Sequence, residues 1–171
     1  MTETRSWQEH TGKLLDSLKG FDVIECKTCG FAHIVPIPSS DELNKFYKKK
    51  YYEQEGKKNY FDEQKSQLDW WNNIFKERCE SFEKILNKKG KILDIGCGPG
   101  FFMQKAQSMD WKVLGIEPSM KASNYAIKNL NLDVINYDLE LIDINNSKLK
   151  EIDVIYTHGV LEHMRNPKSF F

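Results

Sequence analysis

The chain has 171 residues, a length that suits one domain with a small appendage. Lysine plus arginine and aspartate plus glutamate both number 25, so no global positive field recruits nucleic acid or a membrane surface. No apolar run reaches the length of a membrane span, and the polar, amphipathic residues 1–20 differ from a signal peptide. Composition therefore predicts a cytoplasmic protein without a membrane span.

Residues 1–60 differ in composition from the rest, and we predict that they form a separate N-terminal segment. Within them, residues 21–25 alternate like a strand, and residues 31–35 can return as a second strand. The turn between these two strands holds a C-x-x-C motif. The pattern predicts a knuckle-shaped hairpin.

The C-x-x-C motif consists of Cys26 and Cys29, whose thiolates can supply half of a tetrahedral zinc site. The sequence has no second C-x-x-C motif, so His10 and His33 are the candidates to complete the site. The alternative is a hairpin that binds no metal, and the missing cysteine pair favours this alternative.

Two segments with helical spacing follow the hairpin. Tyr47, Tyr51 and Tyr52 are separated as residues on one face of a helix, which can pack against the domain. Between residues 62 and 88, apolar residues recur at steps of three, four and seven, and Gly90 is predicted to close this helix. We expect the long helix to lie on the sheet ahead of its first strand.

A glycine turn after a buried strand organises the remainder of the chain. Ile92, Leu93 and Ile95 are apolar without a regular polar alternation, as expected of a central parallel strand covered on both faces. The turn after this strand holds three glycines, Gly96, Gly98 and Gly100. Glycines allow a ligand to lie against the backbone, and the N–H groups of the following helix point at that ligand. The segment therefore predicts a nucleotide-binding corner.

The pattern of this corner excludes the dinucleotide fingerprint G-x-G-x-x-G, because Phe101 stands at the position of its last glycine. The segment Asp94-Ile95-Gly96-Cys97-Gly98-Pro99-Gly100 instead resembles motif I of the class I S-adenosylmethionine-dependent methyltransferases. The resemblance implies that five of these residues bind the cofactor, namely Asp94, Gly96, Cys97, Gly98 and Gly100.

A second cofactor contact is expected at the end of the second strand, residues 111–116. In a doubly wound sheet, an acid about 20 residues beyond the glycine turn binds the ribose hydroxyls. Glu117 follows Gly98 by 19 residues and occupies this position. The sequence Glu117-Pro118-Ser119 also resembles the post-I motif of the same family, which implies that Glu117 and Pro118 contact the cofactor.

Ser119 can cap the next helix, which is predicted at residues 120–129. The third and fourth strands are predicted at residues 133–136 and 152–157. Asp138 and Leu139 follow the third strand and match the family positions that meet the adenine amino group and cover the adenine ring. Turn preference gives an alternative for Asp138, which is that it starts a turn after the strand.

The fourth strand runs into His158-Gly159-Val160-Leu161-Glu162-His163-Met164, which resembles the V-L-E-H segment of the family. This segment should border the reacting methyl group, because ligands bind where the strand order reverses. His158 and His163 are the nearby histidines that can act as a general base near neutral pH. The alternative for each is a packed, hydrogen-bonded histidine. The Asp/Asn-Pro-Pro-aromatic motif of nucleobase methyltransferases is absent from the sequence, which disfavours nucleic acid as the acceptor.

Residues 26–38 and the tyrosines after them resemble the cysteine-rich start of several small-molecule methyltransferases, which implies a lid on the substrate side. Family members continue through a fifth strand and a reversed hairpin. We therefore expect residues 61–171 to be an S-adenosylmethionine-binding domain that is truncated before its last strands.

The sequence thus predicts an α/β fold: a Rossmann-like, doubly wound, mostly parallel sheet of order 3-2-1-4, with a small N-terminal hairpin region. The resemblance implies S-adenosylmethionine-dependent methyl transfer to a small-molecule acceptor, with zinc as a further cofactor if the hairpin binds metal. Two alternatives stay open: a nicotinamide-dependent oxidoreductase and a non-catalytic nucleotide-binding module. The sequence leaves the oligomeric state open.

Overall fold

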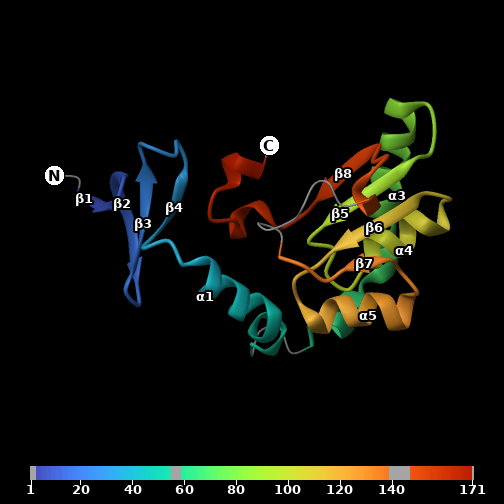
Figure 1. Cartoon of the computed structure of the whole chain (residues 1–171), viewed down its shortest axis with the longest axis horizontal. Coiled ribbons are helices and arrows are strands. Elements are labelled where there is room, and N and C mark those ends of the chain that lie inside the picture. The colour runs from blue at the N-terminus through green and yellow to red at the C-terminus, as the bar shows by residue number, and fades with distance from the viewer. Residues whose placement is uncertain (1–2, 55–58, 139–146, 171) are drawn as a thin grey trace. The chain divides into compact units, whose positions relative to one another are not determined.

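The computed structural model describes residues 3–54, 59–138 and 147–170 (Figure 1). The chain forms two compact units, Met1–Ser40 and Asp41–Phe171. Composition predicts that the N-terminal segment extends to about residue 60. In the structure, the π-helical turn η1 (Phe46–Lys50) already packs on helix α5 (Met120–Leu130) of the second unit. The segment after Ser40 therefore belongs to the larger unit.

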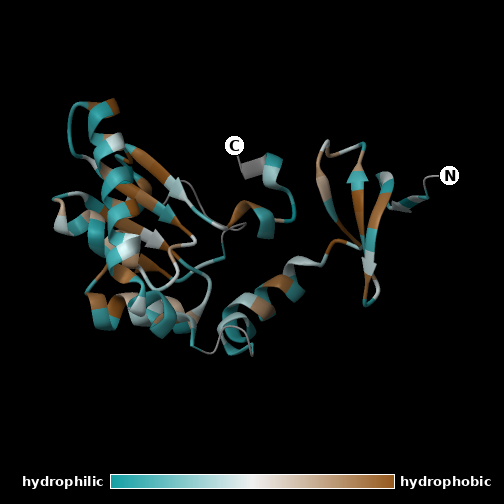
Figure 2. Ribbon diagram, turned by 180° about the vertical axis from the view of Figure 1, so that it is seen from behind, coloured by the Kyte–Doolittle hydropathy of each residue, from teal (hydrophilic) through white to brown (hydrophobic). Residues whose placement is uncertain are grey.

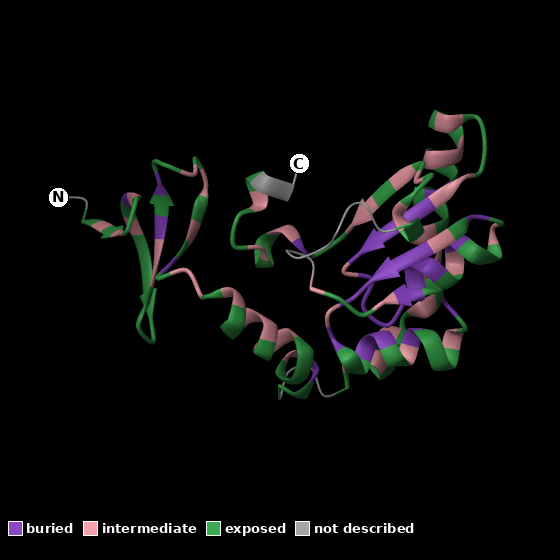
Figure 3. Cartoon of the chain, in the orientation of Figure 1, coloured by how far each residue is buried: buried purple, intermediate pink, exposed green. Residues whose placement is uncertain are grey.

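The first unit is an antiparallel sheet of order β1-β2-β3-β4. Its strands are β1 (Thr4–Trp7), β2 (His10–Leu18), β3 (Phe21–Cys26) and β4 (Ala32–Val35). The predicted hairpin corresponds to β3 and β4, while β1 and β2 come from residues for which the sequence predicted no strand. The buried cluster of this sheet consists of Ile24, Cys26 and Val35, so few residues in it are buried (Figure 3).

Helical segments lead into the second unit. They are α1 (Ser40–Lys45), η1, η2 (Tyr51–Glu53), α2 (Tyr60–Ser66) and α3 (Leu68–Leu86). Helix α3 ends at Asn87, which takes a left-handed conformation with φ of 54°, so the prediction that Gly90 closes this helix is wrong. A Cβ atom at Gly90 would collide with the side chain of Asp153, and this close approach explains the glycine. None of the described helices is long and apolar enough to cross a membrane.

The second unit contains a parallel sheet of order β7-β6-β5-β8. Its strands are β5 (Lys91–Ile95), β6 (Lys112–Ile116), β7 (Val134–Ile135) and β8 (Val154–Thr157). Helix α4 (Phe101–Ser108) connects β5 to β6, and α5 connects β6 to β7. Short 3-10 turns follow at η5 (Ser147–Leu149), η6 (Leu161–His163) and η7 (Pro167–Phe170). The predicted α/β class with a parallel sheet is confirmed. Apolar residues concentrate in the strands of this sheet (Figure 2).

The two faces of this sheet are covered differently. Side chains of α3, α4 and α5 pack in one cluster with Ile92 and Val134, so all three helices cover the same face. On the opposite face, Leu93, Ile95, Leu114 and Ile116 form a second buried cluster. Alternate residues of each strand thus enter different clusters, as the period of two in a strand requires. The central strands β5 and β6 are therefore buried on both faces. Because they are parallel, their carboxyl ends lie together at one edge of the sheet.

Candidate cofactor site

The glycine turn lies at the carboxyl end of β5, between the neighbouring strands β6 and β8. The chain leaves β5 toward β6 through α4 and reaches β8 on the other side only later, so the strand order reverses here. The backbone N–H groups of Gly96 and Cys97 donate to the carbonyl oxygen of Ile116, at 2.8 and 3.2 Å. These two bonds fix the turn to the end of β6.

The three glycines of the turn serve different purposes. All have positive φ angles, of 73°, 54° and 86° in chain order, which favour glycine. A Cβ atom at Gly96 would collide with the side chain of Val160, and one at Gly100 would lie 2.6 Å from Leu132 Cδ1. At Gly98 the nearest atom is the Tyr52 hydroxyl, 3.3 Å from such a Cβ. Gly98 is therefore the glycine whose open side can receive a ligand.

Glu117 connects the end of β6 to this turn. Its carboxylate is buried and accepts hydrogen bonds from the backbone N–H of Gly98, at 2.9 Å, and of Ser119, at 2.8 Å. Burial raises the pKa of Glu117 to about 7, although both hydrogen bonds oppose the rise. A carboxylate has about four lone-pair positions, so two remain for the hydroxyls of a ribose. The structure thus brings Glu117 and Gly98 together as the spacing predicted.

Asp94 is a second buried carboxyl group beside the turn. Burial raises its pKa to about 8, and the nearby charge of Glu117 adds to the rise. Within the described ranges, no cationic side chain pairs with the Asp94 carboxyl. Burial likewise raises the pKa of the Cys97 thiol well above its ordinary value, so this side chain stays neutral. The described part of the site therefore holds two acids without a counter-charge of its own.

Asn136 is a site residue that sequence reasoning missed, because it was predicted as the last residue of the third strand, which ends at Ile135 in the structure. Its Nδ2 donates to the carbonyl oxygens of Glu117, at 2.8 Å, and Pro118, at 3.1 Å, and to Ser123 Oγ, at 3.0 Å. These bonds fix the loop that carries the Glu117 carboxylate. Ser119 caps α5 as predicted, since its side chain accepts a hydrogen bond from the N–H of Ala122.

Tyr52 covers the turn from the helical segment that precedes it. Its ring is buried against Tyr60 and Phe61, with centroids 5.5 and 5.1 Å away. Burial raises the pKa of Tyr52 strongly, so its hydroxyl stays a hydrogen-bond donor. Asp138 is half-buried beyond the end of β7, and Leu139 lies outside the described residues.

The two candidate bases lie after β8, and both are exposed. The ring of His163 contacts those of Tyr47 and Tyr51, with centroids 5.7 and 6.2 Å away. His158 instead contacts Trp71 of α3, at 6.2 Å. The two histidines therefore have different neighbours: the His163 ring contacts two tyrosine rings, and the His158 ring contacts a tryptophan of α3.

The candidate metal ligands converge in the first unit. Cys26 is buried, Cys29 is half-buried, and both thiols lie beside His10. Burial raises the pKa of Cys26, but the Cys29 backbone N–H and the nearby imidazoles of His33 and His10 outweigh it and lower the pKa to about 6. The four candidate metal ligands that were predicted from the sequence, His10, Cys26, Cys29 and His33, are therefore neighbours in the structure.

A parallel sheet with a glycine turn at its switch point and a buried acid at the next strand end defines a Rossmann-like α/β protein with a nucleotide-cofactor site. The family model described as "Methyltransferase domain" matches residues 86–171. The chain belongs to this family, the class I S-adenosylmethionine-dependent methyltransferases.

Curated proteins with similar sequences are also named as methyltransferases. The mitochondrial ubiquinone biosynthesis O-methyltransferase of Schizosaccharomyces pombe is 34% identical over 110 residues, which are 61% of this chain and 38% of that protein. The Coxiella burnetii ubiquinone biosynthesis O-methyltransferase is 30% identical over 58% of this chain and 48% of that protein. A tRNA U34 carboxymethyltransferase of Pseudoalteromonas translucida is 36% identical over 48% of this chain and 27% of that protein. The matches thus span less than half of each relative.

A solved structure supports the fold. The plantazolicin methyltransferase BpumL in complex with SAH aligns with a TM-score of 0.54 at 21% identity, over 75% of this chain and 49% of that one. At this identity the likeness concerns the fold alone. It agrees with the parallel sheet and its covering helices.

Proposed function

We propose that this protein binds S-adenosylmethionine and transfers its methyl group to a small-molecule acceptor. The observation that carries the proposal is the pair formed by the open side of Gly98 and the buried carboxylate of Glu117, which are joined by a hydrogen bond. This pair offers a close backbone approach for the ligand beside two free acceptor positions for ribose hydroxyls.

The charge of the site favours this cofactor over a dinucleotide. Asp94 and Glu117 are both buried, the charge of Glu117 raises the pKa of Asp94, and no cationic side chain in the described ranges offsets the two acids. S-adenosylmethionine carries an ammonium and a sulfonium group, whose positive charges would stabilise ionised carboxylates. A nicotinamide dinucleotide would instead bring a negatively charged pyrophosphate toward two acids. Phe101, buried where a dinucleotide site needs glycine, also disfavours the oxidoreductase.

Methyl transfer requires mainly positioning by the protein. When bound, the sulfonium cofactor would supply an electrophilic methyl group, whose bond to sulfur would break as the bond to the acceptor forms in line with it, with the neutral thioether as the leaving group. The protein must therefore align the acceptor and accept a proton where needed. We assign the role of base to His163, with His158 as the second candidate. Burial raises the pKa of the neighbouring Tyr47 to about 12, with Tyr51 and Glu162 adding to the rise, so this tyrosine remains a proton donor. It can orient an acceptor without competing for its proton.

The surroundings of His163 support a small, planar acceptor. Tyr47 and Tyr51 present aromatic rings to the histidine, and such rings stack well on flat apolar molecules. The equal numbers of acidic and basic residues give the chain no net positive charge to attract nucleic acid. Among the relatives named above, two are ubiquinone biosynthesis O-methyltransferases, which agrees with an acceptor of this kind.

Cofactor binding tests the proposal directly. In calorimetry, the protein should bind S-adenosylmethionine and S-adenosylhomocysteine (SAH). Glu117→Ala should weaken both by about 1.5–3 kcal/mol, or roughly 10- to 150-fold, because the ribose loses a charged acceptor. Glu80→Ala is the matched control, since Glu80 is an exposed acid on α3 that pairs with Lys76. Unchanged affinity in Glu117→Ala, or binding of NADH in place of SAH, would contradict the proposal.

A further inference from the structure

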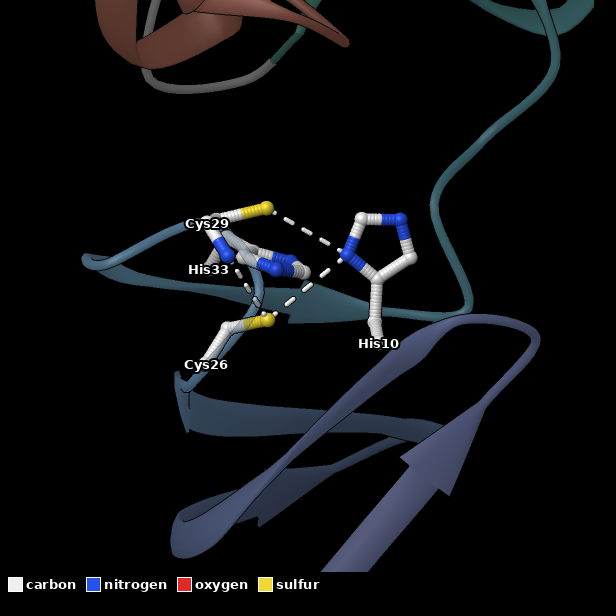
Figure 4. A group of neighbouring side chains, drawn as sticks. All are labelled: His10, Cys26, Cys29 and His33. Carbon is white, nitrogen blue, oxygen red and sulfur yellow. Dashed lines mark hydrogen bonds between the residues drawn. The ribbon is translucent and has the colours of Figure 1, made fainter.

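We propose that His10, Cys26, Cys29 and His33 bind one structural Zn²⁺ ion in the first unit. Each side chain offers one ligand atom, and these four atoms all lie within 4.8 Å of one another. Figure 4 shows the four side chains pointing toward a common centre. They come from the start of β2, the end of β3, the turn after it, and β4.

The distances between these atoms match the edges of a tetrahedral zinc site. With bonds of about 2.3 Å to sulfur and about 2.0–2.1 Å to nitrogen, sulfur and nitrogen ligands lie about 3.5 Å apart. The Nδ1 atom of His10 lies 3.3 Å from Cys29 Sγ and 3.7 Å from Cys26 Sγ. Two thiolates and two neutral imidazoles would balance the charge of Zn²⁺, so the buried centre would be neutral.

The orientation of His33 is the observation that points to a metal. Its Nδ1 lies 2.8 Å from the carbonyl oxygen of Ile34, to which it must donate a proton. Its Nε2 therefore carries a lone pair. This nitrogen is buried and has no hydrogen-bond partner among the described residues, and a ring nitrogen of His33 lies within 4.8 Å of the other three ligand atoms. Metal-binding histidines are held in this way, with a carbonyl fixing one nitrogen and the metal occupying the other.

His10 has a similar second partner. Its Nδ1 faces the two thiols, and its Nε2 lies 3.4 Å from a carboxylate oxygen of Glu9. The His10 side chain is 12% exposed, whereas that of Glu9 is 69% exposed, so the carboxylate stands at the rim. A carboxylate behind a metal-binding imidazole orients the ring and strengthens it as a ligand. The backbone N–H of Cys29 also donates to Cys26 Sγ at 3.4 Å, which stabilises a thiolate there.

The small core of the first unit gives the ion a structural task. The buried cluster contains Ile24, Cys26 and Val35, with Trp7 and Cys29 packed against it. A unit of about 40 residues seldom folds on such a core unless a metal, disulfides or association supplement it. A zinc ion at this position would join β2, β3 and β4, and its binding energy would add to folding.

Metal analysis of the full 171-residue chain, purified without chelator, tests the assignment. About one zinc ion per chain is expected, and Cys26→Ala with Cys29→Ala should lose it. Cys79→Ala is the matched control, because Cys79 is a buried cysteine of the second unit and should not affect zinc content. His33→Cys should keep the ion, since a thiolate can replace an imidazole in a structural zinc site.

Cobalt substitution keeps the test decisive if the cysteine variant fails to fold. After zinc removal, Co²⁺ added to the unaltered chain should give the intense visible absorption of a tetrahedral ion and a thiolate-to-cobalt charge-transfer band. The charge-transfer band should grow in His33→Cys. A metal-free folded chain with the weak spectrum of octahedral Co²⁺, or a Cys26–Cys29 disulfide detected by mass spectrometry, would overturn the proposal.

Discussion

Replacing Gly98 with valine should weaken SAH binding by more than about 100-fold, which corresponds to a loss of about 2.7 kcal/mol. Among the described residues, a Cβ atom at this position meets only the Tyr52 hydroxyl, so the valine methyl groups would occupy the space through which the ligand reaches the backbone. The φ of 54° also strains a residue with a side chain, by about 1–2 kcal/mol. Calorimetry measures the first effect and thermal unfolding the second.

The matched control for this substitution is Gly20→Val. Gly20 also has a positive φ, of 86°, and apart from its own chain neighbours no described residue lies within 4 Å of the position that its Cβ would take, but it belongs to the first unit. The substitution should produce similar backbone strain and leave SAH binding intact. If Gly98→Val bound SAH as tightly as the unaltered protein, the corner would not be the cofactor site.

The ligand-free protein should become less stable as pH rises from about 5 to 8. Burial raises the pKa of Asp94 to about 8 and that of Glu117 to about 7, with Glu117 also raising that of Asp94. The folded state therefore keeps protons that the unfolded state has released, and stability is lost as pH rises through these values. Each group contributes a slope of about 1.4 kcal/mol per pH unit.

Hydrogen exchange of the β5 and β6 amides measures this slope locally. Asp94→Asn removes one titrating group and mimics its neutral form, so its slope should be smaller by the contribution of one carboxyl. Comparing variant and unaltered protein at each pH cancels the contribution of the histidines. An identical slope in Asp94→Asn would show that the Asp94 carboxyl is ionised in the folded protein over this range.

The features that sequence predicted well depend on local rules. The apolar run of β5 and the glycine spacing identified the corner, and the distance in sequence between Gly98 and Glu117 predicted their meeting. The serine before α5 predicted its cap. In each case a short pattern has one common geometry, since strand tips and helix ends recur with the same residue types.

The features that sequence missed depend on long-range pairing. Strands β1 and β2 escaped prediction because both faces of the thin sheet are largely exposed, so their residues show no clear apolar alternation. The tether through Asn136 depends on the β6–β7 pairing. The approach of His10 to the cysteines likewise requires the antiparallel register that pairs Gly12 with Cys26. No local pattern encodes such a register.

The hydrogen bond from Gly98 N–H to Glu117 has a consequence for association kinetics. It forms between two groups of the protein itself, as do the two bonds from the turn to Ile116. The turn therefore loses its conformational freedom during folding, and little freedom is left to lose when a ligand arrives. The observed rate of SAH association should rise linearly with concentration, with no plateau from a slow ordering of this turn, and movement of Tyr52 is the remaining step that could limit it.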